Sequence, residues 1–202
     1  MPESAEEVYA RVVALVGEDG RLPTPPVAGW ETFPWEGDLV TKVVRPPVPS
    51  EPPRLGETLD DPCWRCGHET ENAIWRNDAW LVASTPRPTG LPLVLFLESR
   101  THMDFMDMDD TLASEWGRIS NNLHRIMSYL PHIGRVHVAK WGDGTYHLHT
   151  WFMARTERFP QTLGSYAAEW DEILPPVPEK TWRADLATVA AKLANHDGEA
   201  LV

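Results

Sequence analysis

The chain has 202 residues, of which 42% are hydrophobic and 24% charged, and its formal net charge at pH 7 is −12. This length suits one main core with extensions rather than two full domains. The acidic body repels phosphate backbones at long range, which argues against a nucleic-acid partner. No apolar run reaches the length of about 18 residues typical of a membrane span, and the N-terminus shows no secretory signal. We therefore expect a cytoplasmic protein with no membrane partner.

The N-terminal part predicts a helix followed by an extended arm. Residues 4–16 carry an apolar stripe at helical spacing, and Ser4 with Glu7 forms a capping box at its start. Residues 21–62 are rich in proline, which predicts an extended arm with one short strand near 39–44.

The central part predicts an α+β domain with an antiparallel sheet, because strands come before and after one helix. That helix shows apolar residues in alternating steps of four and three after N-cap candidates Asp109, Asp110 and Thr111. The expected strands span 72–76, 79–84, 93–97, 134–140 and 145–154, and a short helix follows at about 182–193. The predicted divisions are an arm over 1–60, the main domain over 61–159 and a tail over 160–202.

The only two cysteines, Cys63 and Cys66, stand in a C-x-x-C arrangement. Without an export signal, this spacing favours a metal or redox pair over a structural disulfide. Structural zinc takes four tetrahedral Cys and His ligands, so two histidines would complete the site. The pattern alone leaves two reduced thiols as an equal alternative. The histidines available as further ligands are His68, His102, His124, His132, His137, His147 and His149.

His147 and His149 lie one residue apart in the last expected strand. Alternate residues of a strand share a face, about 7 Å apart, so both imidazoles are expected on one side of the sheet. A neutral imidazole attacks phosphorus well and its adduct hydrolyses readily, which suits two-step transfer. It needs a partner that fixes its tautomer. Two neighbouring histidines could divide the work, with one held by a metal and the other free to attack phosphorus. The alternative is that both are hydrogen-bonded histidines of the core.

Residues 71–155 resemble the histidine triad (HIT) superfamily. The resemblance rests on 74–83 as an opening strand pair, 86–97 as a proline-glycine loop and strand, 99–102 as a basic-then-His element, and 147–151 as the signature His-x-His strand. It implies an α+β fold with an antiparallel half-barrel sheet around a central amphipathic helix, and a homodimer. It also implies a nucleotide or nucleotide conjugate as the small-molecule ligand.

The resemblance also implies roles for individual residues. In the family the second signature histidine, here His149, is the nucleophile that takes up a nucleoside monophosphate. In zinc-containing members and the similar galactose-1-phosphate uridylyltransferases, the matching zinc ligands would be Cys63, Cys66, His102 and His147. His68 competes for a ligand position because it lies two residues from Cys66. We therefore expect a structural Zn²⁺.

The chain departs from the family at the third signature position, where Trp151 replaces histidine. Indole donates one hydrogen bond but cannot act as a general acid near neutral pH. The substrate-binding candidates are Trp151 itself, the basic residues Arg76 and Arg100, and Gly144, whose backbone would help to cradle a phosphate. The sequence thus predicts a nucleotidyl hydrolase or nucleotidyltransferase. The alternative is a zinc-stabilised nucleotide-binding or scaffold module that has lost activity.

Overall fold

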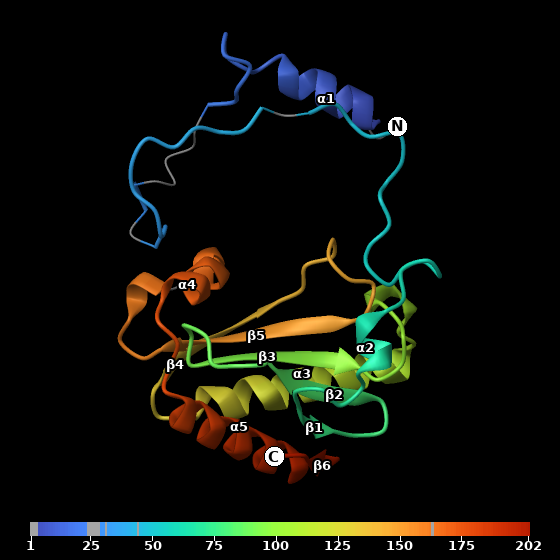
Figure 1. Cartoon of the computed structure of the whole chain (residues 1–202), viewed down its shortest axis with the longest axis vertical. Coiled ribbons are helices and arrows are strands. Elements are labelled where there is room, and N and C mark those ends of the chain that lie inside the picture. Colours follow the sequence, from blue (N-terminus) through green and yellow to red (C-terminus); the bar gives the residue numbers. More distant parts are fainter. Residues whose placement is uncertain (1–3, 24–28, 31, 44, 163) are drawn as a thin grey trace. The chain divides into compact units, whose positions relative to one another are not determined.

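The computed structural model describes residues 4–23, 29–30, 32–43, 45–162 and 164–202 (Figure 1). The chain divides into two compact units, Met1–Pro52 and Pro53–Val202. The predicted arm, domain and tail boundaries remain a prediction. All strands of the described residues belong to the second unit, together with the helices that follow them. Within the described residues, no helix is both long and apolar enough to cross a membrane.

The first unit contains the helix α1, Ala5–Val13. The predicted capping box is confirmed: Ser4 N donates to Glu7 Oε2 over 2.7 Å, and Glu7 N donates to Ser4 Oγ over 3.2 Å. The helix ends three residues earlier than expected. The strand expected near 39–44 is wrong for 39–43, where the chain is irregular. There the Thr41 hydroxyl donates to Leu22 O, and Thr41 O accepts from Arg21 Nη1, so side chains rather than a neighbouring strand make these contacts of Thr41; position 44 lies outside the described residues.

The second unit is built on a six-stranded antiparallel sheet, which confirms the predicted α+β class. The spatial order of the strands is β4-β5-β3-β2-β1-β6, and each neighbouring pair is antiparallel. The strands are β1 Ala73–Arg76, β2 Trp80–Ser84, β3 Leu93–Ser99, β4 Ile133–Ala139, β5 His149–Thr156 and β6 Glu199–Ala200.

Four helices accompany the sheet: α2 Trp64–Gly67, α3 Asp110–Ser128, α4 Ala167–Ile173 and α5 Glu179–Ala194. Short 3-10 turns lie at Phe105–Asp107, Pro160–Thr162 and Gly164–Tyr166. The predicted α3 is confirmed, and Asp109 is its N-cap because its side chain accepts a hydrogen bond from Leu112 N. The helices α2 and α4 and the strand β6 were not predicted, since each is too short to show a period.

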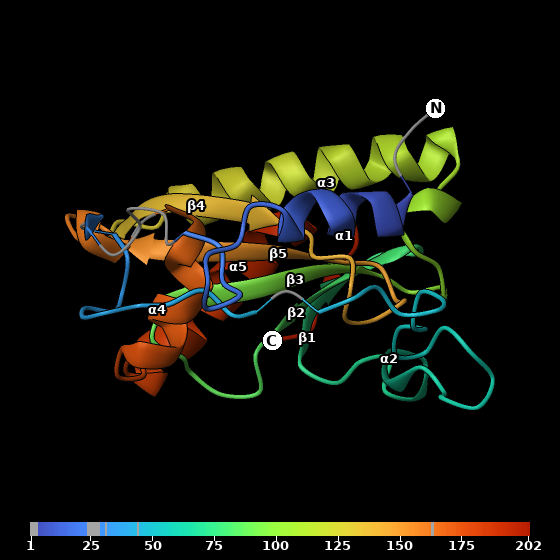
Figure 2. The same ribbon diagram turned by 90° about the horizontal axis from the view of Figure 1, so that it is seen from above.

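Different helices cover the two faces of the sheet. Figures 1 and 2 show α3 and α5 on one side and α4 on the other. Leu93, Leu95 and Leu97 of β3 point into the main core, where Leu123 of α3 and Leu186 of α5 are also buried. The intervening β3 positions belong to the opposite face, where Val94 packs in a smaller cluster with Ala167 of α4. One face therefore carries most of the stabilising burial, which leaves the other available for polar groups.

We predict that Gly198 cannot be replaced without loss of stability. Its φ is +70°, and an added Cβ would lie 2.2 Å from the carbonyl oxygen of Arg76, at the point where the chain enters β6. Gly198→Ala should lower the free energy of unfolding by about 2 kcal/mol or more. Denaturant unfolding measures this change.

Gly117→Ala is the matched control, because Gly117 lies in α3 with open space around the added methyl group. This substitution should stabilise the protein by about 0.5–1 kcal/mol, since alanine favours helix. Equal stability of the two variants would contradict the close approach described for Gly198.

Candidate metal centre and histidine pocket

The two cysteines lie at the start of the second unit and converge because α2 is a single helical turn. Cys63 is the N-cap of α2 and Cys66 is its third residue. Side chains three positions apart on a helix lie on the same side, so both sulfur atoms point toward one volume. The bond from His68 N to Arg65 O closes the turn. This local turn explains why a C-x-x-C spacing can supply two ligands to one ion.

Two histidines from distant segments complete a four-residue cluster. The ligand atoms of Cys63, Cys66, His102 and His147 all lie within 4.8 Å of one another. Cys63 Sγ lies 3.3 Å from His147 Nδ1, and Cys66 Sγ lies 3.5 Å from His102 Nδ1 and 3.7 Å from His147 Nδ1. Zinc bond lengths of about 2.3 Å to sulfur and 2.0–2.1 Å to nitrogen imply tetrahedral S···N edges of about 3.6 Å. The cluster therefore has the dimensions and the donor set of a zinc site.

His147 presents the correct nitrogen to this cluster. Its Nε2 lies 2.7 Å from Ser99 O, and a carbonyl oxygen only accepts hydrogen bonds. Nε2 must therefore carry the proton, and Nδ1 keeps a lone pair that points toward the two sulfur atoms. The residue is 3% exposed. Burial lowers the pKa of His147, which keeps the imidazole neutral as a metal ligand must be.

The thiols complement this neutral imidazole. Desolvation within the cluster, together with the neighbouring Cys63, raises the pKa of the Cys66 thiol to about 11. A thiol that coordinates a divalent cation is deprotonated outright, so an ion would replace these unfavourable contacts by metal–thiolate bonds. The site is compatible with zinc on its own chemistry.

His68 is not part of the cluster. Its Nδ1 lies 2.8 Å from Trp64 O, and its ring stacks on the Trp64 indole with centroids 4.7 Å apart. The structure thus brings His102, rather than the competing His68, to the cysteines. Zinc ligation itself remains a proposal.

His149 begins β5, and its imidazole is fixed by its own chain. Its Nδ1 lies 2.7 Å from His147 O, so Nδ1 donates its proton to that carbonyl. This tautomer leaves a lone pair on Nε2, which makes no hydrogen bond with the part of the chain that the structure describes. The expectation that both histidines belong to one strand is wrong, because β5 starts at His149. His147 precedes the strand and turns toward the cysteines instead.

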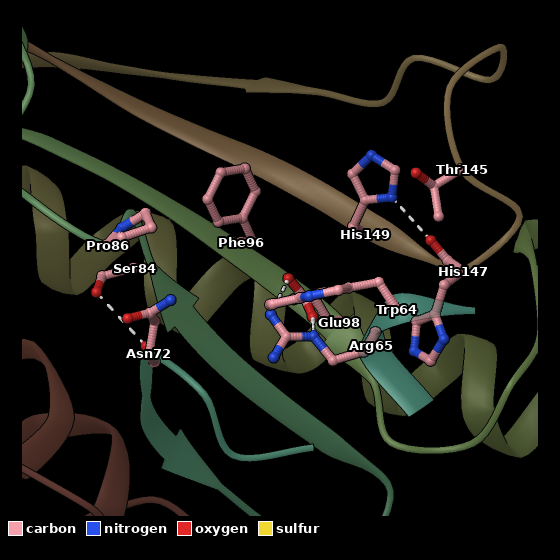
Figure 3. A pocket seen from close by; sticks show the side chains of 10 residues that line it. All are labelled: Trp64, Arg65, Asn72, Ser84, Pro86, Phe96, Glu98, Thr145, His147 and His149. Carbon is pink, nitrogen blue, oxygen red and sulfur yellow. Dashed lines mark hydrogen bonds and ion pairs between the residues drawn. The ribbon is translucent and has the colours of Figure 1, made fainter. Parts of the chain in front are cut away.

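A pocket of about 260 Å³ opens in front of His149 (Figure 3). Its walls combine aromatic, polar and charged side chains from the segment Cys63–Cys66, called here the metal loop after its proposed ion, from strands β2, β3 and β5, and from the segments that connect them. The lining residues are Trp64, Arg65, Asn72, Ser84, Pro86, Phe96, Glu98, Thr145, His147 and His149. Such a mixed concave site suits a small ligand with an apolar ring and several polar groups.

Glu98 and Arg65 form a buried ion pair in this pocket. Arg65 Nη2 donates to Glu98 Oε1 over 3.1 Å, and Arg65 Nε pairs with Glu98 Oε2. Burial raises the pKa of Glu98, and the Arg65 guanidinium opposes this shift by favouring the charged carboxylate. Glu98 is the Cα partner of His149 in the β3–β5 ladder, so the two side chains share one face of the sheet.

Trp151 lies two residues beyond His149 on the same face of β5 but does not line the pocket. Its ring packs edge-on against Phe96 and Trp141, with centroids 4.6 and 5.3 Å away, and lies 6.4 Å from the His149 ring. Its buried Nε1 has no hydrogen-bond partner among the described residues. The indole supports the pocket wall through Phe96.

Of the remaining predicted binding residues, Arg76 and Arg100 do not line the His149 pocket. Arg76 and Arg100 line a separate cavity near β6, where Arg76 pairs with Glu199 over 2.7 Å and Arg100 donates to Asn77 O over 2.9 Å. Gly144 lies next to a pocket residue, and its carbonyl accepts from Leu55 N. Their binding roles stay untested predictions.

Sequence reasoning missed the charged pair of the pocket. Arg65 stands between the two cysteines and is the one residue of Cys63–Cys66 with a long cationic side chain, but its partner Glu98 is distant in the sequence. Glu98 follows a nearly uninterrupted apolar run, and a carboxylate at the end of a buried strand is itself a sign of function.

Solved structures of histidine triad proteins are similar to this chain at TM-scores below 0.5. No protein-family model matches the chain, and no curated protein does. Among solved structures, the chain is similar to a hypothetical histidine triad nucleotide-binding protein from Sulfolobus tokodaii, with 11% identity, 66% of this chain and 93% of that chain covered, and a TM-score of 0.49. A second similar structure is a Zn-bound histidine triad family protein from Mycobacterium smegmatis. It has 16% identity, 67% of this chain and 97% of that chain are covered, and the TM-score is 0.48. A third is a HIT family hydrolase from Clostridium thermocellum, with 14% identity, 52% of this chain and 100% of that chain covered, and a TM-score of 0.40.

These identities and TM-scores assign no residue roles, and nothing among them singles out the uridylyltransferase branch. The roles of the cysteines and histidines therefore come from the geometry of this chain, and they are taken up as proposals below.

We predict that purified protein contains about one zinc per chain and that His102→Ala lowers this content at least tenfold after dialysis against a mild chelator. Loss of one ligand opens the tetrahedral site. His68→Ala, two residues from Cys66 but outside the cluster, should keep its zinc. Elemental analysis of the three proteins checks this, and equal zinc in all of them would exclude His102 as a ligand.

Proposed function

We propose that this protein is a nucleotidyl hydrolase or nucleotidyltransferase that acts on a phosphoanhydride or phosphoramidate of a nucleotide. The observation that carries the proposal is the tautomer of His149. Its Nδ1 proton is held by His147 O, so the Nε2 lone pair is available beside a pocket lined by aromatic, polar and charged side chains. An imidazole in this state is a competent nucleophile toward phosphorus.

The reaction would take place in two balanced steps. In the first, the Nε2 lone pair of His149 forms a bond to the α-phosphorus, and the bond from phosphorus to the leaving group breaks with its electron pair. Water supplies the proton that the leaving group takes up. In the second, water or another acceptor attacks the same phosphorus and releases its proton to the solvent, which replaces the proton taken up in the first step; the N–P bond breaks, and the imidazole recovers its lone pair.

The cluster of Cys63, Cys66, His102 and His147 would hold zinc as a structural ion. Bound zinc would supply a fixed position for His147, with no part in the bond changes. His147 in turn supplies the carbonyl that orients His149. The resemblance to the histidine triad superfamily further supports a homodimer.

A second function is favoured by Trp151. The residue at this position is packed between two aromatic rings and has no titratable proton near neutral pH, so the chain lacks a general acid there. This observation supports a zinc-stabilised module that binds a nucleotide without turning it over. The two functions share the pocket and differ only in whether His149 becomes covalently modified.

Intact-mass spectrometry separates the two functions. After incubation with adenosine 5′-phosphoramidate, dinucleoside polyphosphates or sugar nucleotides, and a denaturing quench at alkaline pH that preserves the N–P bond, the wild type should gain the mass of one nucleoside monophosphate. His149→Ala should show no gain and at least about a thousandfold slower turnover, because the nucleophile is lost.

His124→Ala is the control, since His124 is exposed on α3 and does not line the pocket. It should form the adduct at the wild-type rate. Nucleotide binding without any adduct or turnover across the panel would establish the binding module instead, and an adduct that survives in His149→Ala would refute His149 as the nucleophile.

A further inference from the structure

The four residues of the metal cluster come from three chain segments that are far apart in the sequence. Cys63 and Cys66 lie on the metal loop, His102 follows β3, and His147 precedes β5. Cys66 and His102 are exposed, so the hydrophobic core does not fix their side chains. A ligand that other contacts already orient loses less freedom when the ion binds. The residues that hold these three segments together therefore bear on the affinity of the site.

A buried carboxylate outside the cluster joins the three segments. Asp104 is 7% exposed and lies two residues after His102. Arg54, which precedes the metal loop, donates through Nη1 to Asp104 Oδ2 and, over 3.1 Å, to Gly142 O. Lys140, which with Gly142 belongs to the connection between β4 and β5, places its Nζ 3.1 Å from Asp104 Oδ1. Arg54, Asp104 and Lys140, called here the Asp104 clamp, thus link all three segments through one buried charge.

The chain that follows the arginine of the clamp contacts both the metal loop and the β4–β5 connection. Gly56 has a φ of +80°, and an added Cβ there would lie 3.0 Å from Cys63 Cα. Leu55 N donates to Gly144 O over 3.1 Å, and Tyr146 N donates to Leu55 O over 2.9 Å. The position of the first cysteine therefore depends on where the clamp and these backbone bonds hold the segment.

Tyr146 connects the clamp to the two histidines of the cluster. The guanidinium carbon of Arg54 lies 4.7 Å from the centroid of the Tyr146 ring, and the centroid of the His102 ring lies 5.4 Å from the same point. The Tyr146 hydroxyl donates to Asp107 Oδ2 over 2.7 Å. His147 is the next residue in the chain. The exposed His102 thus lies against a ring that the clamp holds in place, and His147 is attached to that ring's backbone.

We propose that the Asp104 clamp positions the metal ligands and thereby sets the affinity of the site for zinc. This inference rests on the metal centre of the proposed function, and it concerns residues that are not ligands themselves. Arg54 lies before residues 71–155, the part of the chain that resembles the histidine triad superfamily. The metal centre of this protein is therefore supported by a segment outside that resemblance.

Titration of the metal-free protein with chelator-buffered zinc measures this affinity. Asp104→Asn keeps the shape of the side chain but removes the charge that both cations bind, and Arg54→Met removes the guanidinium. Each variant should bind zinc at least about tenfold more weakly than the wild type, which is the scale of effect for residues that orient metal ligands. Denaturant unfolding of the metal-free proteins identifies the variants that are folded under the conditions of the titration.

The double variant Arg54→Met with Asp104→Asn separates one shared contact from two independent structural losses. If the two residues act as a pair, the double variant should bind zinc within about threefold of the weaker single variant. Independent effects would multiply to at least about a hundredfold, and that result would contradict the clamp.

Asp185→Asn and Arg183→Met are the matched controls. Asp185 is also a buried carboxylate, paired with His132 over 2.9 Å, and Arg183 also pairs with a carboxylate and lies over an aromatic ring. Both residues belong to α5 and lie outside the metal cluster. Both variants should bind zinc within about twofold of the wild type, because distant substitutions do not couple to the site.

The zinc affinities decide the inference. Wild-type affinity in Asp104→Asn and Arg54→Met overturns the clamp and leaves the metal centre and the His149 chemistry intact. An equal loss of affinity in the α5 controls would show that the effect reflects general stability, and it would also reject the inference. If Asp104→Asn does not fold, Arg54→Met and Lys140→Met carry the same test, because both cationic side chains are 21% exposed.

The same experiment distinguishes this inference from the proposed function. A wild type that binds no zinc overturns the metal centre and the clamp together. A wild type that binds zinc but forms no nucleotide adduct, with at least tenfold weaker zinc binding in the clamp variants, supports the clamp and rejects His149 as the nucleophile.

Discussion

The hydrogen bond between His147 Nε2 and the Ser99 carbonyl is the contact on which the site depends. It anchors a buried imidazole to the end of β3 and fixes which nitrogen carries the proton. Nδ1 is then the only lone pair that can meet Cys63 and Cys66, and the His147 carbonyl is placed to receive the proton of His149. One residue thus ties the cluster to the pocket through its ring and its backbone.

The two faces of the sheet have separate tasks, so the polar site does not reduce the apolar burial that stabilises the fold. The leucines of β3 fill the core beneath α3 and α5, where burial of apolar surface stabilises the fold. The other face of the sheet carries Phe96 and Glu98, which are alternate residues of β3. Along this face, apolar packing near α4 gives way to polar side chains beside His149. A strand with a period of two can serve both purposes at once.

The sequence predicted those parts of the molecule whose signals are local or strongly periodic. The apolar spacing of α3, the Ser4 capping box and the apolar run of β3 are of this kind. The C-x-x-C pair indicated two residues of the cluster, and the resemblance to the histidine triad superfamily added His102 and His147, although His147 proved to precede the strand. The Arg65–Glu98 pair, the separate position of Arg76 and the existence of β6 depend on contacts between distant residues, which composition and spacing do not encode.

The order of assembly follows from where α5 and β6 lie in the chain. Trp182 of α5 is buried in the same core as the sheet, and β6 covers the outer edge of β1. These segments follow the other strands in the sequence, yet they close a surface made of much earlier residues. During synthesis that surface remains open to water until α5 has left the ribosome. A nascent chain interrupted before this point would expose an aggregation-prone apolar face and an unpaired strand edge.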